Sequence, residues 1–133
     1  MICRKFLKLE TFCIFVQLNT LILQYFNTLF LENVDRFLET LDLKSANKIV
    51  YNIKLAEQTN DPRLLKKVHP HIWEFRTKTA GNEIRLLAFW DKTNSANTLV
   101  VATHGFVKKT WKIPSTEIER ALKIRDIYFD SEH

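Results

Sequence analysis

The chain has 133 residues, enough for one domain whose hydrophobic core needs no disulfide or metal to hold it together. Its 20 Lys and Arg residues outnumber 15 Asp and Glu, and the net charge of +5 favours an anionic partner: nucleic acid, an acidic protein or a membrane surface. With two glycines, three prolines and two cysteines that lack metal-ligand spacing, the composition excludes long disordered linkers and a cysteine-based zinc site. The cysteines are typical of reduced thiols, so we expect a cytoplasmic protein.

The first residues differ in composition from the rest of the chain. We predict an N-terminal extension of unknown role over 1–20 and a single domain over 21–133. The stretch 11–31 carries no charge and is long enough to cross a membrane. No small-x-small cleavage site follows it, and it contains four amide side chains that hydrocarbon would leave unpaired: Gln17, Asn19, Gln24 and Asn27. We therefore expect no membrane association, with an anchor over 11–31 as the alternative.

The next part of the chain predicts a strand followed by two helices. The apolar run 21–30, rich in Leu and Phe, is expected to form a first strand. Apolar residues spaced i, i+3, i+4 and i+7 predict a short helix over 32–41, and a second stripe begins at Ala46. The second helix is expected to end before Pro62. Two helices joined by a short turn form an antiparallel hairpin whose stripes face the core.

After the helices the hydrophobic period changes to that of strands. Three runs, 71–77, 84–90 and 98–106, alternate or are mostly apolar, and turn-forming residues separate them. Such strands form an antiparallel meander. A final helix is predicted over 115–129, with Ser115 or Thr116 as its cap. The order strand, two helices, three strands and helix predicts an α+β fold with one layer of sheet and one of helices.

Basic residues gather in two segments that the meander would bring together. Arginine binds phosphate through a planar fork and lysine through a point charge, so one face could hold an RNA backbone. Trp73 and Trp111 could stack on an unpaired base. Arg85 lies on the strand between the two segments. The first basic segment contains Arg63, Lys66, Lys67, His69, His71, Arg76 and Lys78. The second contains His104, Lys108, Lys109 and Lys112.

Most of these residues also have an ordinary structural interpretation. Arg76 and Arg85 fit outward positions on strands, and the pair Lys108–Lys109 is typical of a solvated turn. Trp73 alternates onto the apolar face, which favours a place in the core over a stacking platform. For His104, a buried, hydrogen-bonded histidine and a general acid are equally open interpretations.

We expect no cofactor and no metal. The chain has no Gly-rich phosphate loop, no GxSxG and no HExxH motif, and the pair His69 and His71 lacks a third ligand. An enzyme of this composition would act through positive charge. Cleavage of RNA by its own 2′-hydroxyl is such a reaction, because the protein only has to align the nucleophile and stabilise the charge that gathers on phosphorus.

The run IWEFRTKTAGNEIRLLAFWDK, followed by LVVATHGFVKKTWKIPSTEIERA, resembles the phage-derived Gp49-like, HigB-type branch of the RelE/ParE toxin superfamily, over about residues 29–128. The resemblance implies a helical hairpin packed on a small curved antiparallel β-sheet with a C-terminal helix. It also implies a cytoplasmic toxin of a type II toxin–antitoxin system. Such toxins commonly cleave mRNA in the ribosomal A site, and an antitoxin, often with a helix-turn-helix domain, silences them.

The resemblance further assigns roles to individual residues. Arg85 matches the arginine at the scissile phosphate, the pair Lys108–Lys109 matches the residues that bind or protonate the leaving group, and Arg76 matches an arginine on the neighbouring strand. His104 or Glu74 is then the expected proton carrier. The expected products are a 2′,3′-cyclic phosphate and a 5′-hydroxyl, formed without metal. Further contacts with RNA are expected from Lys66, Lys67, Lys78, Trp111 and Lys112.

The sequence departs from the family pattern in three places. Relatives often carry a small or polar residue where Trp111 stands, Thr commonly precedes the proline where Ile113 stands, and the extension 1–20 is unlike the family. Two other functions stay open. ParE-type toxins share the fold but poison gyrase, so they would arrest supercoiling and leave mRNA intact. A non-enzymatic nucleic-acid-binding module would bind RNA or DNA without cleaving it.

Overall fold

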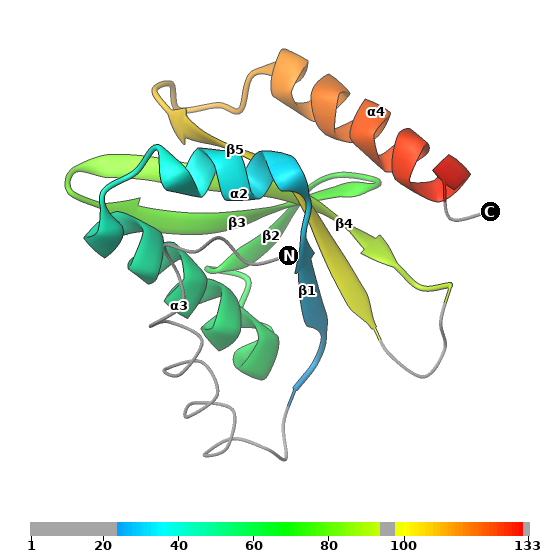
Figure 1. Cartoon of the computed structure of the whole chain (residues 1–133), viewed down its shortest axis with the longest axis horizontal. Helices are drawn as coiled ribbons and strands as arrows, with labels where there is room; N and C mark the ends of the chain where they lie inside the picture. Colours follow the sequence, from blue (N-terminus) through cyan, green and yellow to red (C-terminus); the bar gives the residue numbers. More distant parts are fainter. Residues whose placement is uncertain (1–23, 94–97, 132–133) are drawn as a thin grey trace.

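The computed structural model describes residues 24–93 and 98–131, and it has the predicted α+β fold (Figure 1). The predicted extension 1–20 and most of the stretch 11–31 lie outside these residues. None of the helices in the described ranges has the length and apolar character needed to span a membrane. The elements are β1 (Asn27–Phe30), α2 (Glu32–Glu39), α3 (Leu43–Thr59), β2 (Leu65–His69), β3 (Ile72–Thr79), β4 (Asn82–Asp91), β5 (Leu99–Lys108) and α4 (Ser115–Ser131).

The five strands form one sheet in the order β1-β5-β4-β3-β2. Strands β3, β4 and β5 form the predicted antiparallel meander, and β2 extends it as an additional antiparallel strand. The sequence indicated no strand at β2, because its residues LKKVH do not alternate. Strand β1 pairs with β5 in parallel, so the sheet is mostly antiparallel with one parallel pair at its edge, a direction that the sequence had not indicated. Two helices and three strands separate β1 from β5, a connection long enough for parallel pairing.

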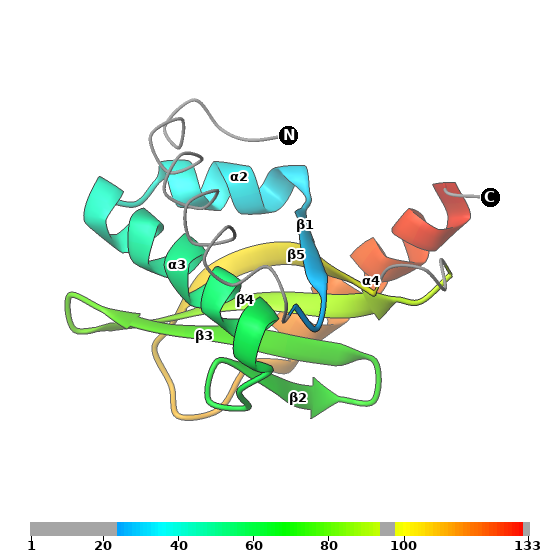
Figure 2. The same ribbon diagram turned by 90° about the horizontal axis from the view of Figure 1, so that it is seen from below.

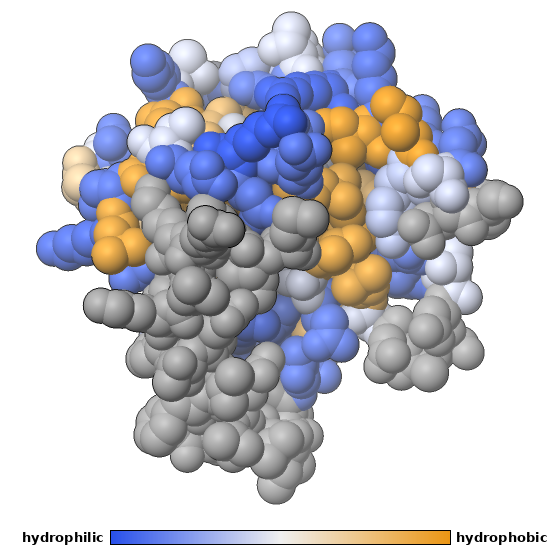
Figure 3. All heavy atoms as spheres, in the orientation of Figure 1, coloured by the Kyte–Doolittle hydropathy of each residue, from blue (hydrophilic) through white to orange (hydrophobic). Residues whose placement is uncertain are grey.

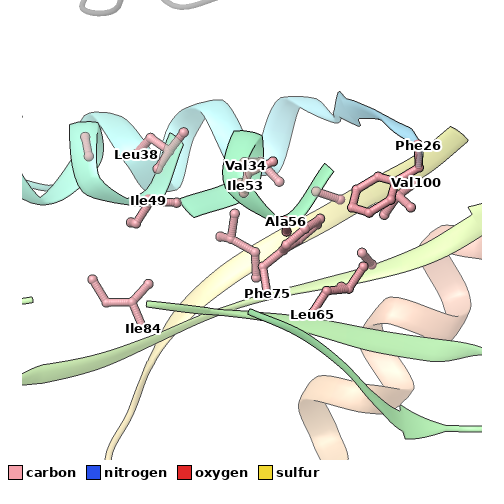
Figure 4. Close-up of a cluster of buried hydrophobic side chains, with 14 residues drawn as sticks. Phe26, Val34, Leu38, Ile49, Ile53, Ala56, Leu65, Phe75, Ile84 and Val100 are labelled. Carbon is pink, nitrogen blue, oxygen red and sulfur yellow. The ribbon is translucent and has the colours of Figure 1, made fainter. Parts of the chain in front are cut away.

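The helical hairpin of α2 and α3 covers one face of the sheet (Figure 2). Asp42 caps α3, because its side chain accepts a hydrogen bond from the Ser45 backbone N–H at 3.1 Å. The helix ends at Asn60, which adopts the left-handed conformation with φ of 52°. The apolar stripes of both helices pack on alternate residues of β3, β4 and β5, as Figure 4 shows for Phe75, Ile84 and Val100.

The final helix, α4, packs on the opposite face of the sheet (Figure 4). Its Ala121 is buried in a second, smaller cluster with Leu87, Phe89 and Val101. These strand residues alternate with the ones that face α2 and α3. Hydrophobic atoms also reach the surface between α2 and α4 (Figure 3). The helical hairpin therefore covers most of one face of the sheet, and α4 covers part of the other face, where it contacts β3, β4 and β5.

Candidate nucleic-acid interface

Three cross-strand rows build a charged surface on the α4 side of the sheet. Residues directly opposite each other in an antiparallel pair project from the same face. The register aligns Arg76 with Arg85, and in the flanking rows Lys78 with Glu83 and Glu74 with Leu87. The next strand continues the rows with Phe106, Lys108 and His104. We call this surface the charged face; its members are Glu74, Arg76, Lys78, Glu83, Arg85, His104 and Lys108.

Arg85 lies at the centre of the charged face and is only 2% exposed. Its Nε lies 3.1 Å from Oε1 of Glu74, and its Nη2 donates a hydrogen bond to Oε1 of Glu83 at 2.7 Å. Its Nη1 donates to the backbone carbonyl of Ile84 at 3.1 Å. Arg85 is thus neither the outward strand residue nor the open phosphate ligand that the sequence suggested. It is a buried guanidinium already surrounded by acceptors.

Glu74 is buried as well and is shared by two arginines. Its second oxygen, Oε2, lies 3.6 Å from Nε of Arg76, whose side chain is 37% exposed. A carboxylate between two guanidiniums fixes their position and offsets part of their charge. Arg76, Lys78 and Lys108 are therefore the cations of this surface that solvent can reach more readily. Four basic side chains surround two carboxylates here, and such an arrangement can bind an anion.

The sequence left two interpretations of His104 open, a buried, hydrogen-bonded histidine and a general acid. The structure agrees with the first. Its ring is 1% exposed, with Nδ1 3.0 Å from Oγ1 of Thr103 and Nε2 3.1 Å from Oε1 of Glu117 on α4. Thr103 is the extra residue of a bulge in β5, since Leu87 pairs with His104 and Ala88 with Ala102. The histidine therefore joins β5 to the first turn of α4. Its proton would reach a substrate only after Glu117 had moved.

This environment makes the stability of the fold sensitive to the protonation of His104. Burial, and then repulsion by Arg120, lower the pKa of His104 below 6.5, although Glu117 acts in the opposite sense. The unfolded chain then binds the proton more readily, and stability is lost as pH falls from about 6.5 through the folded pKa. In urea unfolding at pH 7.5 and 5.5, the wild-type midpoint should fall more than that of His104→Gln. Parallel pH profiles of the two proteins would contradict this role.

The residues after β5 form an exposed basic loop. Trp111 is 90% exposed, the highest value among the large hydrophobic side chains of the described residues. Lys109 and Lys112 are exposed beside it, and β5 itself ends at Lys108. The loop leads from the charged face to α4, so these side chains extend the basic surface beyond the sheet.

The remaining predicted contacts divide between the two faces of the sheet. Lys66 pairs with Glu74 in the register and so lies on the charged face. Lys67 pairs with Trp73 on the other face, and its Nζ lies 5.2 Å from the centre of the Trp73 ring. Trp73 packs against the main core and against Trp90, which agrees with the core interpretation and not with a stacking platform.

Glu83 is the functional candidate that the sequence interpretation missed. Two features of the sequence could have indicated Glu83. It stands two positions before Arg85 on one strand, so the two side chains share a face, and the short turn after β3 places Glu83 opposite Lys78. Arg85 lowers the pKa of Glu83 by a hydrogen bond and by its charge, and Lys78 and Lys108 act in the same direction. Glu83 is therefore held in the ionised form.

Within the described ranges, no group of three or more His, Cys, Asp or Glu side chains is arranged to hold a metal ion. The rings of His69 and His71 lie 6.1 Å apart, and the His71 backbone N–H donates to Nδ1 of His69 at 3.2 Å. The pair thus stabilises the turn between β2 and β3.

Fold and surface together define a small basic α+β protein whose mostly antiparallel sheet presents a cluster of charged side chains beside a C-terminal helix. The family model described as phage-derived protein Gp49-like (DUF891) matches residues 36–126, and the chain belongs to this family. This confirms the Gp49-like resemblance, and it is consistent with a toxin of a toxin–antitoxin system. The matched residues include β2 to β5 and every member of the charged face. No curated protein matches the sequence significantly.

Proposed function

We propose that this protein is the toxin of a type II toxin–antitoxin system and acts in the cytoplasm as a metal-independent, ribosome-dependent endoribonuclease. The observation that supports this function is the cluster of Arg76, Arg85 and Lys108 around Glu74 and Glu83 on one sheet face. It joins a fixed, buried guanidinium to two partly exposed cations. Membership of the Gp49-like family supports the same conclusion.

The proposed reaction needs only groups that RNA and this surface supply. The 2′-hydroxyl attacks the adjacent phosphorus and loses its proton, a 2′-O–P bond forms, the P–O5′ bond breaks, and O5′ takes up a proton. A 2′,3′-cyclic phosphate and a 5′-hydroxyl result. Negative charge grows on the phosphoryl oxygens and on O5′, where Arg76, Arg85 and Lys108 would stabilise it. Lys108 or Lys109 would protonate the leaving oxygen.

The proton acceptor has to be a side chain that can take the proton of the 2′-hydroxyl. Glu74 and His104 are the residues of suitable chemistry, and both are buried and paired. The place of Glu74 between two guanidiniums suits it to orienting Arg76 and Arg85. His104 would take part only once Glu117 had moved from its ring.

The ribosome and mRNA would meet the rest of the basic surface. Lys66, Lys78 and Lys112 can extend along the backbone of the RNA, and Trp111 can stack on a base. Contact by Lys67 requires RNA that passes around the edge strand β2, since this side chain lies over Trp73. The cognate antitoxin, expected to carry a helix-turn-helix domain, would silence the toxin by covering the charged face or by displacing α4.

Cleavage can be tested by primer extension on mRNA bound to purified 70S ribosomes. The wild type should cut within the A-site codon, and Lys108→Ala should lose roughly 100-fold or more in rate, the usual effect of removing one group that stabilises the transition state. Lys44→Ala is the matched control, because Lys44 is exposed on α3 under the opposite face and should leave the rate unchanged.

Three results would contradict the proposal. Intact mRNA with arrested supercoiling would indicate the ParE-type function. Binding of RNA without any cleavage would indicate the non-enzymatic module. An equal loss of cleavage rate in Lys108→Ala and Lys44→Ala would show that the charged face takes no part in the reaction.

A further inference from the structure

Glu83 holds the place on Arg85 that an external anion would need. Three acceptors surround the guanidinium of Arg85: Glu74, the carbonyl of Ile84 and Glu83. The first two are buried and belong to the sheet. The Glu83 side chain is 43% exposed, so it is the acceptor of Arg85 that solvent reaches most readily.

The surroundings of Glu83 suit a phosphate group. Lys78 on β3 and Lys108 on β5 flank Glu83 directly in the register, and both belong to the same face. A phosphodiester presents a negative charge and oxygen acceptors at the geometry that a carboxylate presents to arginine. Nε of Arg85 faces Oε1 of Glu74 at 3.1 Å, so Nη2, which now donates to Glu83, is the donor that an incoming anion would take. An anion that replaced Glu83 would meet one guanidinium and two ammonium groups.

The contact of Glu83 with Arg85 is also one that a ligand can break. Ion pairs with a solvent-exposed partner contribute little, because water and salt screen them. Glu83 lies at the second position of β4, close to the turn at Ala80 and Gly81, so its side chain can swing outward without disturbing the core. Glu74 has no such freedom, since it is buried beneath Arg85 and Arg76.

We infer that Glu83 is an internal competitor that occupies the phosphate position on Arg85, and that an RNA phosphodiester displaces it on binding. This inference rests on the proposed function and explains how a buried, paired Arg85 can still contact the scissile phosphate. In the free protein Glu83 keeps the guanidinium in place and lowers the affinity of the face for anions. Substrate binding then moves the carboxylate away and brings Lys78 and Lys108 onto the same phosphate.

The test is the affinity for a fluorescently labelled, single-stranded 2′-O-methyl RNA of about 12 nucleotides, a length that spans one such surface. The 2′-O-methyl groups block cleavage, so anisotropy reports binding alone. Glu83→Gln should bind about three- to tenfold more tightly than the wild type, because glutamine keeps the shape of the side chain and loses its charge. Its dependence on salt should also be steeper, since in the wild type the displaced Glu83 carboxylate takes up a cation and so offsets one of the counterions released from the RNA.

Glu32→Gln is the matched control. Glu32 also pairs with an arginine, Arg36, at 2.6 Å, but on α2 over the opposite face of the sheet. This variant has the same change in net charge and should bind within twofold of the wild type. If Glu83→Gln fails to fold by circular dichroism, Glu83→Asp shortens the side chain, withdraws it from Arg85 and should give a smaller gain in the same direction.

The outcomes separate this inference from the proposed function. Equal or weaker binding by the folded Glu83 variants, with clear binding by the wild type, overturns the inference alone. Equal gains in Glu83→Gln and Glu32→Gln overturn it too, because net charge then explains both. Failure of every protein to bind the RNA overturns the inference, and primer extension on 70S ribosomes then tests the proposed function separately.

Discussion

Replacing Gly105 by alanine is expected to lower the free energy of unfolding by about 2–3 kcal/mol, the upper part of the range for overpacked cores. A Cβ atom at this position would lie 2.3 Å from Cδ2 of Phe37 and 2.5 Å from Cδ2 of Leu86. Phe37 comes from α2 and Leu86 from β4, so the added methyl group would push a helix and a neighbouring strand away from β5. Gly105 lets α2 approach the sheet closely.

Gly81→Ala supplies the matched control for this experiment. Gly81 has a φ of +77° and open space where its Cβ would be, so alanine there meets backbone strain without a clash. We expect a cost of about 1 kcal/mol for this variant. Urea unfolding of both variants measures the difference. If Gly105→Ala lowered the free energy of unfolding no more than Gly81→Ala, the contact with Phe37 would not require glycine at position 105.

The second large effect is expected from Arg85→Met, which should cost about 3 kcal/mol or more of stability at neutral pH. The substitution leaves the Glu74 carboxylate buried, and the longer, 3.6 Å contact to Arg76 is its remaining ion pair within the described ranges. Breaking one side of a buried ion pair is costly because the remaining charge stays out of water. The double variant Glu74→Leu/Arg85→Met should recover much of the loss, since it removes both charges.

Arg36→Met is the control for the burial argument. It breaks the exposed pair with Glu32 on α2 and should cost less than about 1 kcal/mol. Chemical unfolding of all three variants at one pH compares them directly. If Arg85→Met were no more destabilising than Arg36→Met, the centre of the charged face would not be a buried ion-pair network.

Most elements of the fold could be predicted because their hydrophobic periods are regular. The stripe of α2 and the alternation around Trp73 each indicate one element and one buried face. Strand β2 could not be predicted, because its form depends on pairing with β3 and not on a pattern of its own. The direction of β1 is equally a tertiary property, since four residues carry no signal for parallel or antiparallel pairing.

The candidate site could be predicted in its composition but not in its connections. The predicted meander brought the segments of Arg76, Arg85 and Lys108 side by side, and the register places these residues on one face. The predicted meander could not show that Arg85 is buried, which follows from the two carboxylates around it. The contact of His104 with Glu117 likewise depends on where α4 packs.

Amide chemical-shift mapping tests most directly whether RNA binds the charged face. Uniformly ¹⁵N-labelled protein would be titrated with the 2′-O-methyl RNA, and shift changes would be followed for each backbone amide. We expect the largest changes in β3, β4 and β5 around Arg76, Glu83 and Lys108, and in the loop that carries Trp111. Changes confined to α2 and α3, with the charged face unaffected, would contradict RNA binding at the charged face.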